Sequence, residues 1–191
     1  HSPTIHKDTV NILLDGNGMA AGLLKNGHSR MVTPKKMNLD GGFLGAEDSD
    51  YVPYIDTCDK IHAQTNVAYG MFPNFITPTD TSGYPAILFW PKGLRETEFE
   101  WTQLAPKWPG DEKPDYWNEQ ETSFDSIMDE DFQNLEPMQR SHDAGVFESM
   151  PLNYQERRIY YYHQVIDDWI GRDNLPENIQ VPNVLDPFIE V

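Results

Sequence analysis

The amino-acid sequence predicts an α+β domain in which helices pack on one face of an antiparallel sheet. Strand-like runs come first along the chain and helical patterns come last. One run, Glu96–Leu104, alternates apolar and polar side chains, as a strand with one solvent-facing side does. The 191 residues suffice for one domain with its own core, and 15 prolines and 13 glycines predict many short elements.

The expected strands lie in the first half of the chain. Residues 10–24 form a strand pair around the turn Asp15–Gly18, because apolar residues alternate before that turn and small apolar residues follow it. Residues 34–60 are expected to be mostly loop. Three further runs are expected to be strands: His62–Met71, Ala86–Trp90 and Glu96–Leu104.

Two helices are expected after a loop over residues 105–118. The first spans Phe124–Arg140, with Ser123 as its N-cap. The second spans Tyr154–Ile170, begins with a capping box and ends at Gly171. Its expected buried stripe, at helical spacing, is Ile159, Tyr162, Ile166, Trp169 and Ile170. The tail 172–191 is expected to be extended coil.

Composition excludes several classes of function. A single cysteine, Cys58, rules out a zinc or iron–sulfur site built from several thiolates of this sequence. Its lack of disulfide partners favours a cytoplasmic setting. The net charge of −17 makes nucleic acid an unfavourable partner. No run of eighteen apolar residues occurs, so no membrane helix is expected.

Asp131 breaks the pattern of the first helix. Its acidic neighbours Asp129 and Glu130 fall outside the apolar arc of the helical wheel, whereas Asp131 falls within it. The arc consists of Phe124, Ile127, Met128, Phe132, Leu135 and Met138, which are expected to face the core. A carboxylate that faces a core needs a hydrogen-bond donor, a proton or a metal ion. Asp131 is therefore either satisfied by protein donors or a metal ligand.

Two histidines, His1 and His6, open the sequence with Pro3 between them. Alone, this spacing is weak, since leading histidines also arise from processing. Combined with Asp131, however, two imidazoles and one carboxylate make the facial triad of non-haem Fe(II) oxygenases, which leaves coordination positions open.

These residues resemble the iron motifs of Rieske-type ring-hydroxylating oxygenase α subunits. The segment His1–His6 is similar to the end of the family's D-x2-H-x4-H motif, and residues 129–140 are similar to its "EDxxnlExmQr" pattern. Further similar stretches are Phe72-Pro73-Asn74, Phe89-Trp90-Pro91, Gly145-Val146-Phe147 and the start of the second helix. The resemblance runs from His1 to about Gly171.

The resemblance implies a helix-grip fold, of the Bet v 1/START type, incomplete at its N-terminus. It also implies a terminal oxygenase that hydroxylates an aromatic or alicyclic substrate with O2. Its mononuclear Fe(II) would be held by His1, His6 and Asp131. Electrons would come from NAD(P)H through a reductase or ferredoxin and a Rieske 2Fe–2S cluster. A homotrimer, with or without a β subunit, is the implied assembly.

The chain departs from the family by lacking the cysteines and histidines of a Rieske domain. Residues 1–191 are therefore expected to be one fragment of a catalytic domain that is inactive in isolation. Candidate pocket residues, each also compatible with plain core packing, are Met71, Phe72, Asn74, Phe89 and Phe124. Two rival functions stay open: a non-catalytic binder of hydrophobic ligands with the same fold, and a zinc hydrolase that uses the same triad.

Overall fold

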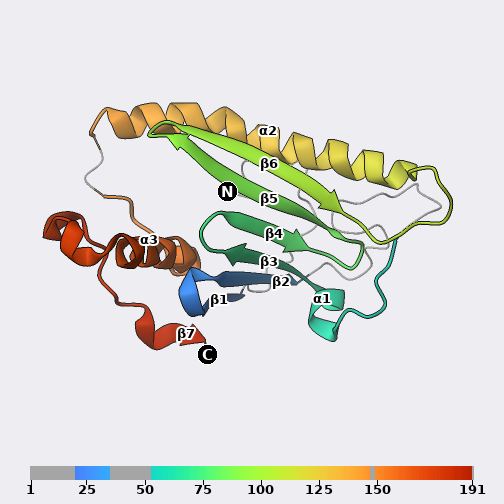
Figure 1. Ribbon diagram of the computed structural model, residues 1–191, viewed down its shortest axis with the longest axis horizontal. Helices are drawn as coiled ribbons and strands as arrows, with labels where there is room; N and C mark the ends of the chain where they lie inside the picture. Colours follow the sequence, from blue (N-terminus) through green and yellow to red (C-terminus); the bar gives the residue numbers. More distant parts are fainter. Residues whose placement is uncertain (1–19, 35–52, 147–148, 191) are drawn as a thin grey trace.

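A curved sheet and two long helices form the fold in the computed structural model (Figure 1). The structure describes residues 20–34, 53–146 and 149–190. The sheet in these ranges has seven strands in the order β6-β5-β4-β3-β2-β1-β7. The α+β class, with strands first and helices after them, is therefore confirmed.

The sheet is antiparallel from β1 to β6. Its strands are β1 (Ala20–Leu24), β2 (Ser29–Pro34), β3 (Thr65–Met71), β4 (Phe75–Thr79), β5 (Tyr84–Gly93) and β6 (Glu96–Leu104). A seventh strand, β7 (Ile189–Glu190), pairs with β1 in parallel. The sheet is thus mixed rather than purely antiparallel, because the end of the chain returns to its edge.

The predicted strands are found with shifted limits. Glu96–Leu104 is confirmed at both ends, whereas the first residues expected in the strand His62–Met71 belong to the short helix α1 (Lys60–Gln64). Asp59 caps that helix by accepting a hydrogen bond from the His62 backbone N–H. The strands β2 and β4 were not expected. Of the strand pair predicted over residues 10–24, the first strand lies outside the described residues and the second corresponds to β1.

The first long helix, α2 (Asp115–Asp143), begins well before the predicted start. Ser123 lies inside the helix, so its prediction as N-cap was wrong, and Pro114 stands at the cap position instead. The buried residues of α2 lie in its first half: Tyr116, Trp117, Gln120, Phe124 and Ile127. In the second half the predicted apolar arc is largely exposed, with Leu135 at 55% and Met138 at 51%.

The second long helix is confirmed in its limits and cap. A single turn of 3-10 helix, η2 (Tyr154–Glu156), leads into α3 (Arg157–Ile170). Asn153 and Glu156 form the expected capping box, and Gly171 follows the last helical residue with φ 87°. The predicted stripe was wrong, however, because the buried residues of α3 are Tyr161, Gln164, Val165 and Asp167.

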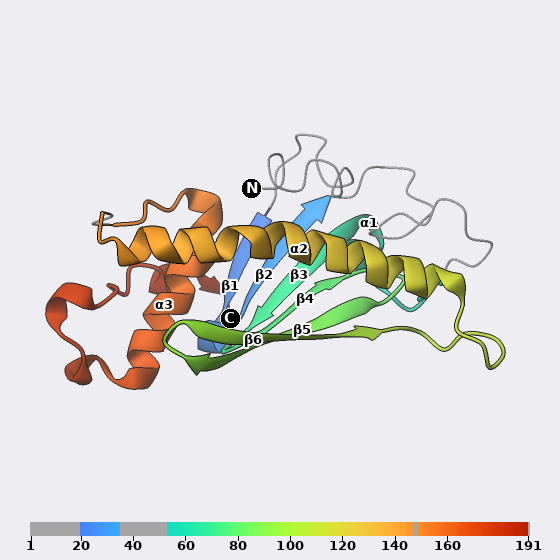
Figure 2. The ribbon, with the colours of Figure 1, turned by 90° about the horizontal axis from the view of Figure 1, so that it is seen from above.

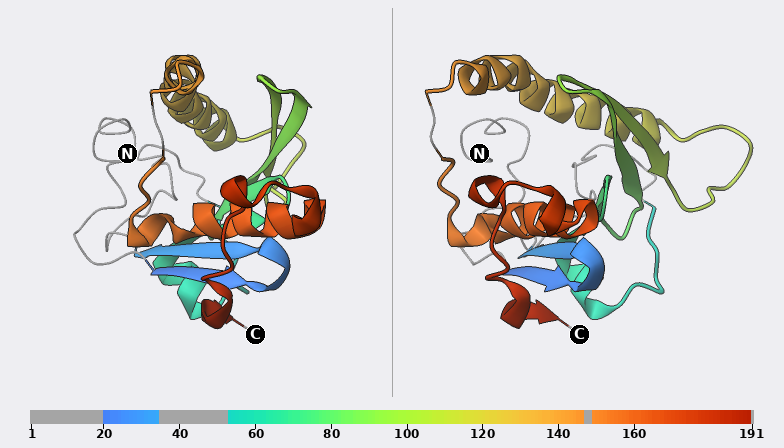
Figure 3. Two further views of the ribbon diagram at one scale, coloured as in Figure 1. Left: turned by 90° about the vertical axis from the view of Figure 1, so that its left-hand side faces the viewer. Right: turned by 60° about the vertical axis from the view of Figure 1, so that its left-hand side comes forward.

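Both long helices lie on the concave side of the sheet (Figure 3). On β6, the ring of Trp101 lies 4.5 Å from that of Phe124 in α2. At the other end, Leu23 of β1 shares a buried cluster with Tyr161 and Val165 of α3. Seen from above, α2 runs over the sheet with its C-terminal end toward α3 (Figure 2). Helices packed on one face of the sheet, as in a helix-grip fold, are therefore confirmed.

The tail after α3 is more ordered than extended coil. It contains three short 3-10 turns, η3 (Arg172–Asn174), η4 (Glu177–Ile179) and η5 (Asp186–Phe188), before β7. Gln164 donates to Asp186 Oδ1 at 2.6 Å, and Asp167 accepts from the Val181 N–H at 2.6 Å. The tail therefore provides hydrogen-bond partners for two polar residues on the buried side of α3.

Tyr161 fastens α3 to the β1–β2 connection. Its hydroxyl donates to Leu24 O at 2.8 Å and accepts from Gly27 N at 3.2 Å. We expect Tyr161→Phe to lower the free energy of unfolding by about 1–3 kcal/mol, because it leaves buried backbone groups without a partner. Urea denaturation followed by circular dichroism measures this change. Tyr154→Phe, at a side chain that is 75% exposed, is the matched control and should change stability little.

Candidate functional site

Asp131 lies one turn beyond Ile127 on the buried side of α2. Successive steps of three or four residues lead from Phe124 through Ile127 to Asp131, so the three side chains share one face of the helix. Asp131 is half-buried, whereas Asp129 is exposed. Glu130 is also half-buried. The helical wheel therefore predicted a larger difference in burial between Asp131 and Glu130 than the structure has.

The other two predicted ligands, His1 and His6, lie outside the described residues. Within the described ranges, no three histidine, cysteine or acidic side chains gather as a metal site would require. Asp131 is therefore the one member of the predicted triad whose place in the fold can be described. A half-buried carboxylate on an inward helix face is compatible with the carboxylate position of a two-histidine, one-carboxylate Fe(II) site.

The five candidate pocket residues fall into separate places. Phe124 of α2 packs against the ring of Trp101 on β6. The ring of Phe89 lies 5.5 Å from that of Phe99, on the same side of the sheet as Trp101. Phe72 instead packs against α3, where its ring lies 5.5 Å from that of Trp169. Strand alternation puts Met71 on the face opposite Gly70, away from the helices.

Asn74 connects two of these places through its backbone. Its carbonyl oxygen accepts a hydrogen bond from the Phe89 N–H at 3.0 Å, so the β3–β4 turn and β5 lie side by side. The structure thus brings Asn74 and Phe89 together. It does not bring Met71 or Phe72 to Phe124, and the role of all five in substrate binding stays a prediction.

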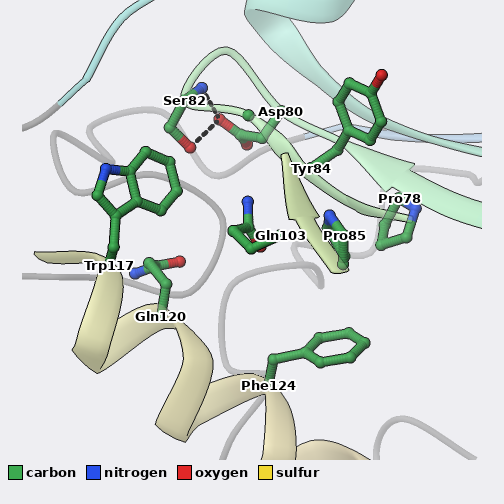
Figure 4. Close-up of a pocket in the computed structure, with 10 residues that line it drawn as sticks. Pro78, Asp80, Ser82, Tyr84, Pro85, Gln103, Trp117, Gln120 and Phe124 are labelled. Carbon is green, nitrogen blue, oxygen red and sulfur yellow. Dashed lines mark hydrogen bonds between the residues drawn. The ribbon is translucent and has the colours of Figure 1, made fainter. Parts of the chain in front are cut away.

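A small hollow lies between the β4–β5 turn and the first half of α2 (Figure 4). Asp80 and Ser82 of the turn face Trp117, Gln120 and Phe124 of the helix across it. Its volume of about 20 Å³ holds one water molecule and no aromatic ring. This hollow is therefore part of the core packing rather than a substrate site.

A larger hollow of about 360 Å³ lies beside the second half of α2. It is bounded by Asn134, Pro137, Met138, Ser141, His142, Ser149, Met150 and Pro151. Its volume is in the range of small-molecule sites. Asn134 follows Asp131 by three residues, so the hollow borders the same helix face as the carboxylate.

Sequence reasoning missed this hollow. Met138 was assigned to the core because it matches the apolar period of α2, and Met150 stands in a proline-punctuated connection without any period. The one available signal was the position of Asn134, which shares the helix face of Asp131. Nothing in the sequence pattern shows that the 149–151 segment returns to this face.

The centre of the concave face between the two helices is only partly covered. Strand register places Met31, Ala68, Gly70 and Ile76 side by side on this face of β2, β3 and β4. Met31 and Ala68 are half-buried, and Ile76 is 41% exposed. These residues form an apolar floor, which we call the central floor.

Arg158 of α3 reaches the edge of the central floor. Its Nε donates to Ser29 Oγ at 3.0 Å, and its Nη2 lies 3.2 Å from where a Cβ on Gly70 would stand. Burial lowers the pKa of the Arg158 guanidinium below its usual value. The group nevertheless stays cationic at neutral pH, because an arginine pKa starts so high.

The comparison with protein families decides the class of the chain. The model of the ring hydroxylating alpha subunit (catalytic domain) matches residues 1–172. The chain belongs to this family. The match includes the segment of His1 and His6, Asp131, and both long helices, as the resemblance in sequence implied.

The tail with β7 lies beyond the family match but is part of the same fold. No curated protein and no solved structure matches the chain significantly. A search of the described helices found none with the length and apolar character needed to cross a bilayer.

Proposed function

We propose that the chain is the catalytic domain of a terminal oxygenase that hydroxylates an aromatic or alicyclic substrate with O2. The observation that carries the proposal is the position of Asp131. Its carboxylate lies on the inward face of α2, within the family match and three residues before Asn134, which borders the hollow of about 360 Å³. A carboxylate that could bind a metal ion and a hollow of small-molecule size thus share one helix face.

The proposed iron ligands are His1, His6 and Asp131. The two imidazoles would bind in their neutral form and Asp131 as a carboxylate, and this set suits Fe(II) with open coordination positions. When bound, the iron supplies activation of O2.

Electrons would reach this site from outside the chain. We propose that a Rieske 2Fe–2S cluster, reduced by NAD(P)H through a reductase or ferredoxin, is the donor, since Cys58 is the only cysteine of the sequence. We also propose a cytoplasmic homotrimer, with or without a β subunit. The N-terminal part of the α subunit would supply the Rieske domain.

Metal analysis together with an O2-uptake assay tests the proposal. The purified full-length α subunit, supplied with reductase, ferredoxin and NADH, should contain mononuclear iron. It should consume O2 in step with formation of a hydroxylated product. Labelled O2 should place its oxygen in that product.

Two rival functions predict other results. A hydrophobic-ligand carrier binds the aromatic compound but contains no mononuclear iron and consumes no O2. A zinc hydrolase contains zinc and releases a hydrolysis product without O2. Either result would replace the oxygenase proposal.

A further inference from the structure

Arg158 differs from the other arginines of the described chain in its partners. Four of them pair with a carboxylate: Arg30 with Glu190, Arg95 with Asp143, Arg140 with Glu136, and Arg172 with Asp168. Arg157 donates to the backbone oxygens of Tyr154 and Ala21 and lies over the Tyr154 ring. Arg158 has one hydrogen bond, to the neutral hydroxyl of Ser29.

The missing acid is unexpected in this chain. The sequence has 31 acidic residues against 14 basic ones, yet within the part of the chain that the structure describes none pairs with Arg158. A guanidinium has five N–H donors, and burial of a cation is costly unless a counter-charge or hydrogen bonds offset it. Among the described residues, Arg158 thus has N–H donors without acceptors and no carboxylate partner.

The surroundings of Arg158 suit a ligand with an apolar ring. Ser29 and Gly70, which flank the guanidinium, are followed on the same face by Met31 and Ala68 of the central floor. Because Gly70 has no side chain, the space beside the guanidinium stays open. A cation at the edge of a partly exposed apolar floor recognises a molecule that is apolar at one end and anionic at the other.

We propose that Arg158 binds a carboxylate of the substrate, so that the preferred substrate is an aromatic or alicyclic acid. A planar guanidinium matches a carboxylate with two parallel hydrogen bonds, and such charge-assisted bonds are stronger than neutral ones. The apolar ring would lie over the central floor. The identity of the molecule as a substrate rests on the proposed oxygenase function, whereas the binding of the acid does not.

Binding of benzoate and benzamide to the full-length protein tests the proposal. The two probes have the same ring and similar size, but only benzoate is anionic at neutral pH. Isothermal titration calorimetry should show benzoate bound about ten- to a hundredfold more tightly than benzamide. Arg158→Gln should abolish this preference, and Arg158→Lys should keep part of it because it retains the charge without the planar fork.

Arg95→Gln is the matched control, because it removes one positive charge at a 70% exposed side chain in the β5–β6 turn, outside the central floor. It should leave the preference for benzoate unchanged. Circular dichroism verifies that each variant is folded. Equal binding of the two probes, no binding of benzoate, or a preference that persists in Arg158→Gln would each overturn the proposal, the last because another cation would then bind the acid.

The outcome for Arg158 can be separated from that for the oxygenase. If benzoate is preferred but no O2-dependent product forms, the acid site stands and the proposed reaction fails. If turnover depends on Asp131 while binding shows no preference for the acid, the reaction stands and the role of Arg158 fails.

Discussion

Asp131→Ala should remove the mononuclear iron and lower O2-dependent hydroxylation by at least about 100-fold. Loss of residues that merely orient metal ligands costs about 10–100-fold in metal affinity or activity, and loss of a ligand should cost at least as much. Asp131 is the proposed carboxylate of the set, so alanine also removes the negative charge that offsets the metal. Iron content and product formation, measured on the same preparation, test this expectation.

The control for this experiment is Asp129→Asn. Asp129 is exposed on the outer side of α2, two residues before Asp131, and its replacement removes the same charge from the same helix. It should leave iron content and turnover unchanged. If Asp131→Ala kept full activity, or if Asp129→Asn lost as much as Asp131→Ala, the assignment of Asp131 as a ligand would be wrong.

Asp131 could be predicted because helical periodicity is local. Its position relative to Phe124 and Ile127 follows from 3.6 residues per turn, and α2 obeys that period across this segment. The hollow bordered by Asn134 could not be predicted, because it depends on where the 149–151 segment returns to α2. Such a return is a long-range contact that no local pattern encodes.

The distinction between local patterns and long-range contacts also explains which strands and helices could be predicted. Glu96–Leu104 alternates cleanly and was predicted to the residue, and the capping box at Asn153 fixed the start of the second helix. The strand β2 was missed because two of its inward positions are the polar Ser29 and Thr33, which are buried against the helices or neighbouring strands. Polar residues in a strand interior conceal its period.

The wrong stripe on α3 has a related cause. Gln164 and Asp167 are polar but buried, because Asp186 and Val181 of the tail provide their hydrogen-bond partners. The apolar Trp169 is 74% exposed instead. Hydrophobic periodicity assumes that polar side chains face solvent, and a helix covered by a hydrogen-bonding tail violates that assumption.

Trp117→Ala should be among the most destabilising single changes in the described chain, with a loss of about 3–5 kcal/mol in the free energy of unfolding. Trp117 is 2% exposed and packs with Tyr116, their ring centroids being 4.9 Å apart. Gly83, with φ 138°, lies against the indole ring, since a Cβ there would stand 3.3 Å from Trp117. Alanine would leave a large cavity between α2 and the β4–β5 turn.

The sequence placed Trp117 in a loop between a strand and a helix, and a tryptophan in an exposed loop would tolerate alanine. The structure places it in the first turn of α2, where its indole packs against the β4–β5 turn at Gly83. Urea denaturation of the full-length protein, followed by circular dichroism, separates the two expectations. Trp169→Ala is the matched control, because the indole of Trp169 is 74% exposed and packs against Phe72 at the surface, so its loss should cost no more than about 1 kcal/mol. Equal losses for the two variants would mean that α2 is not held to the sheet through Trp117.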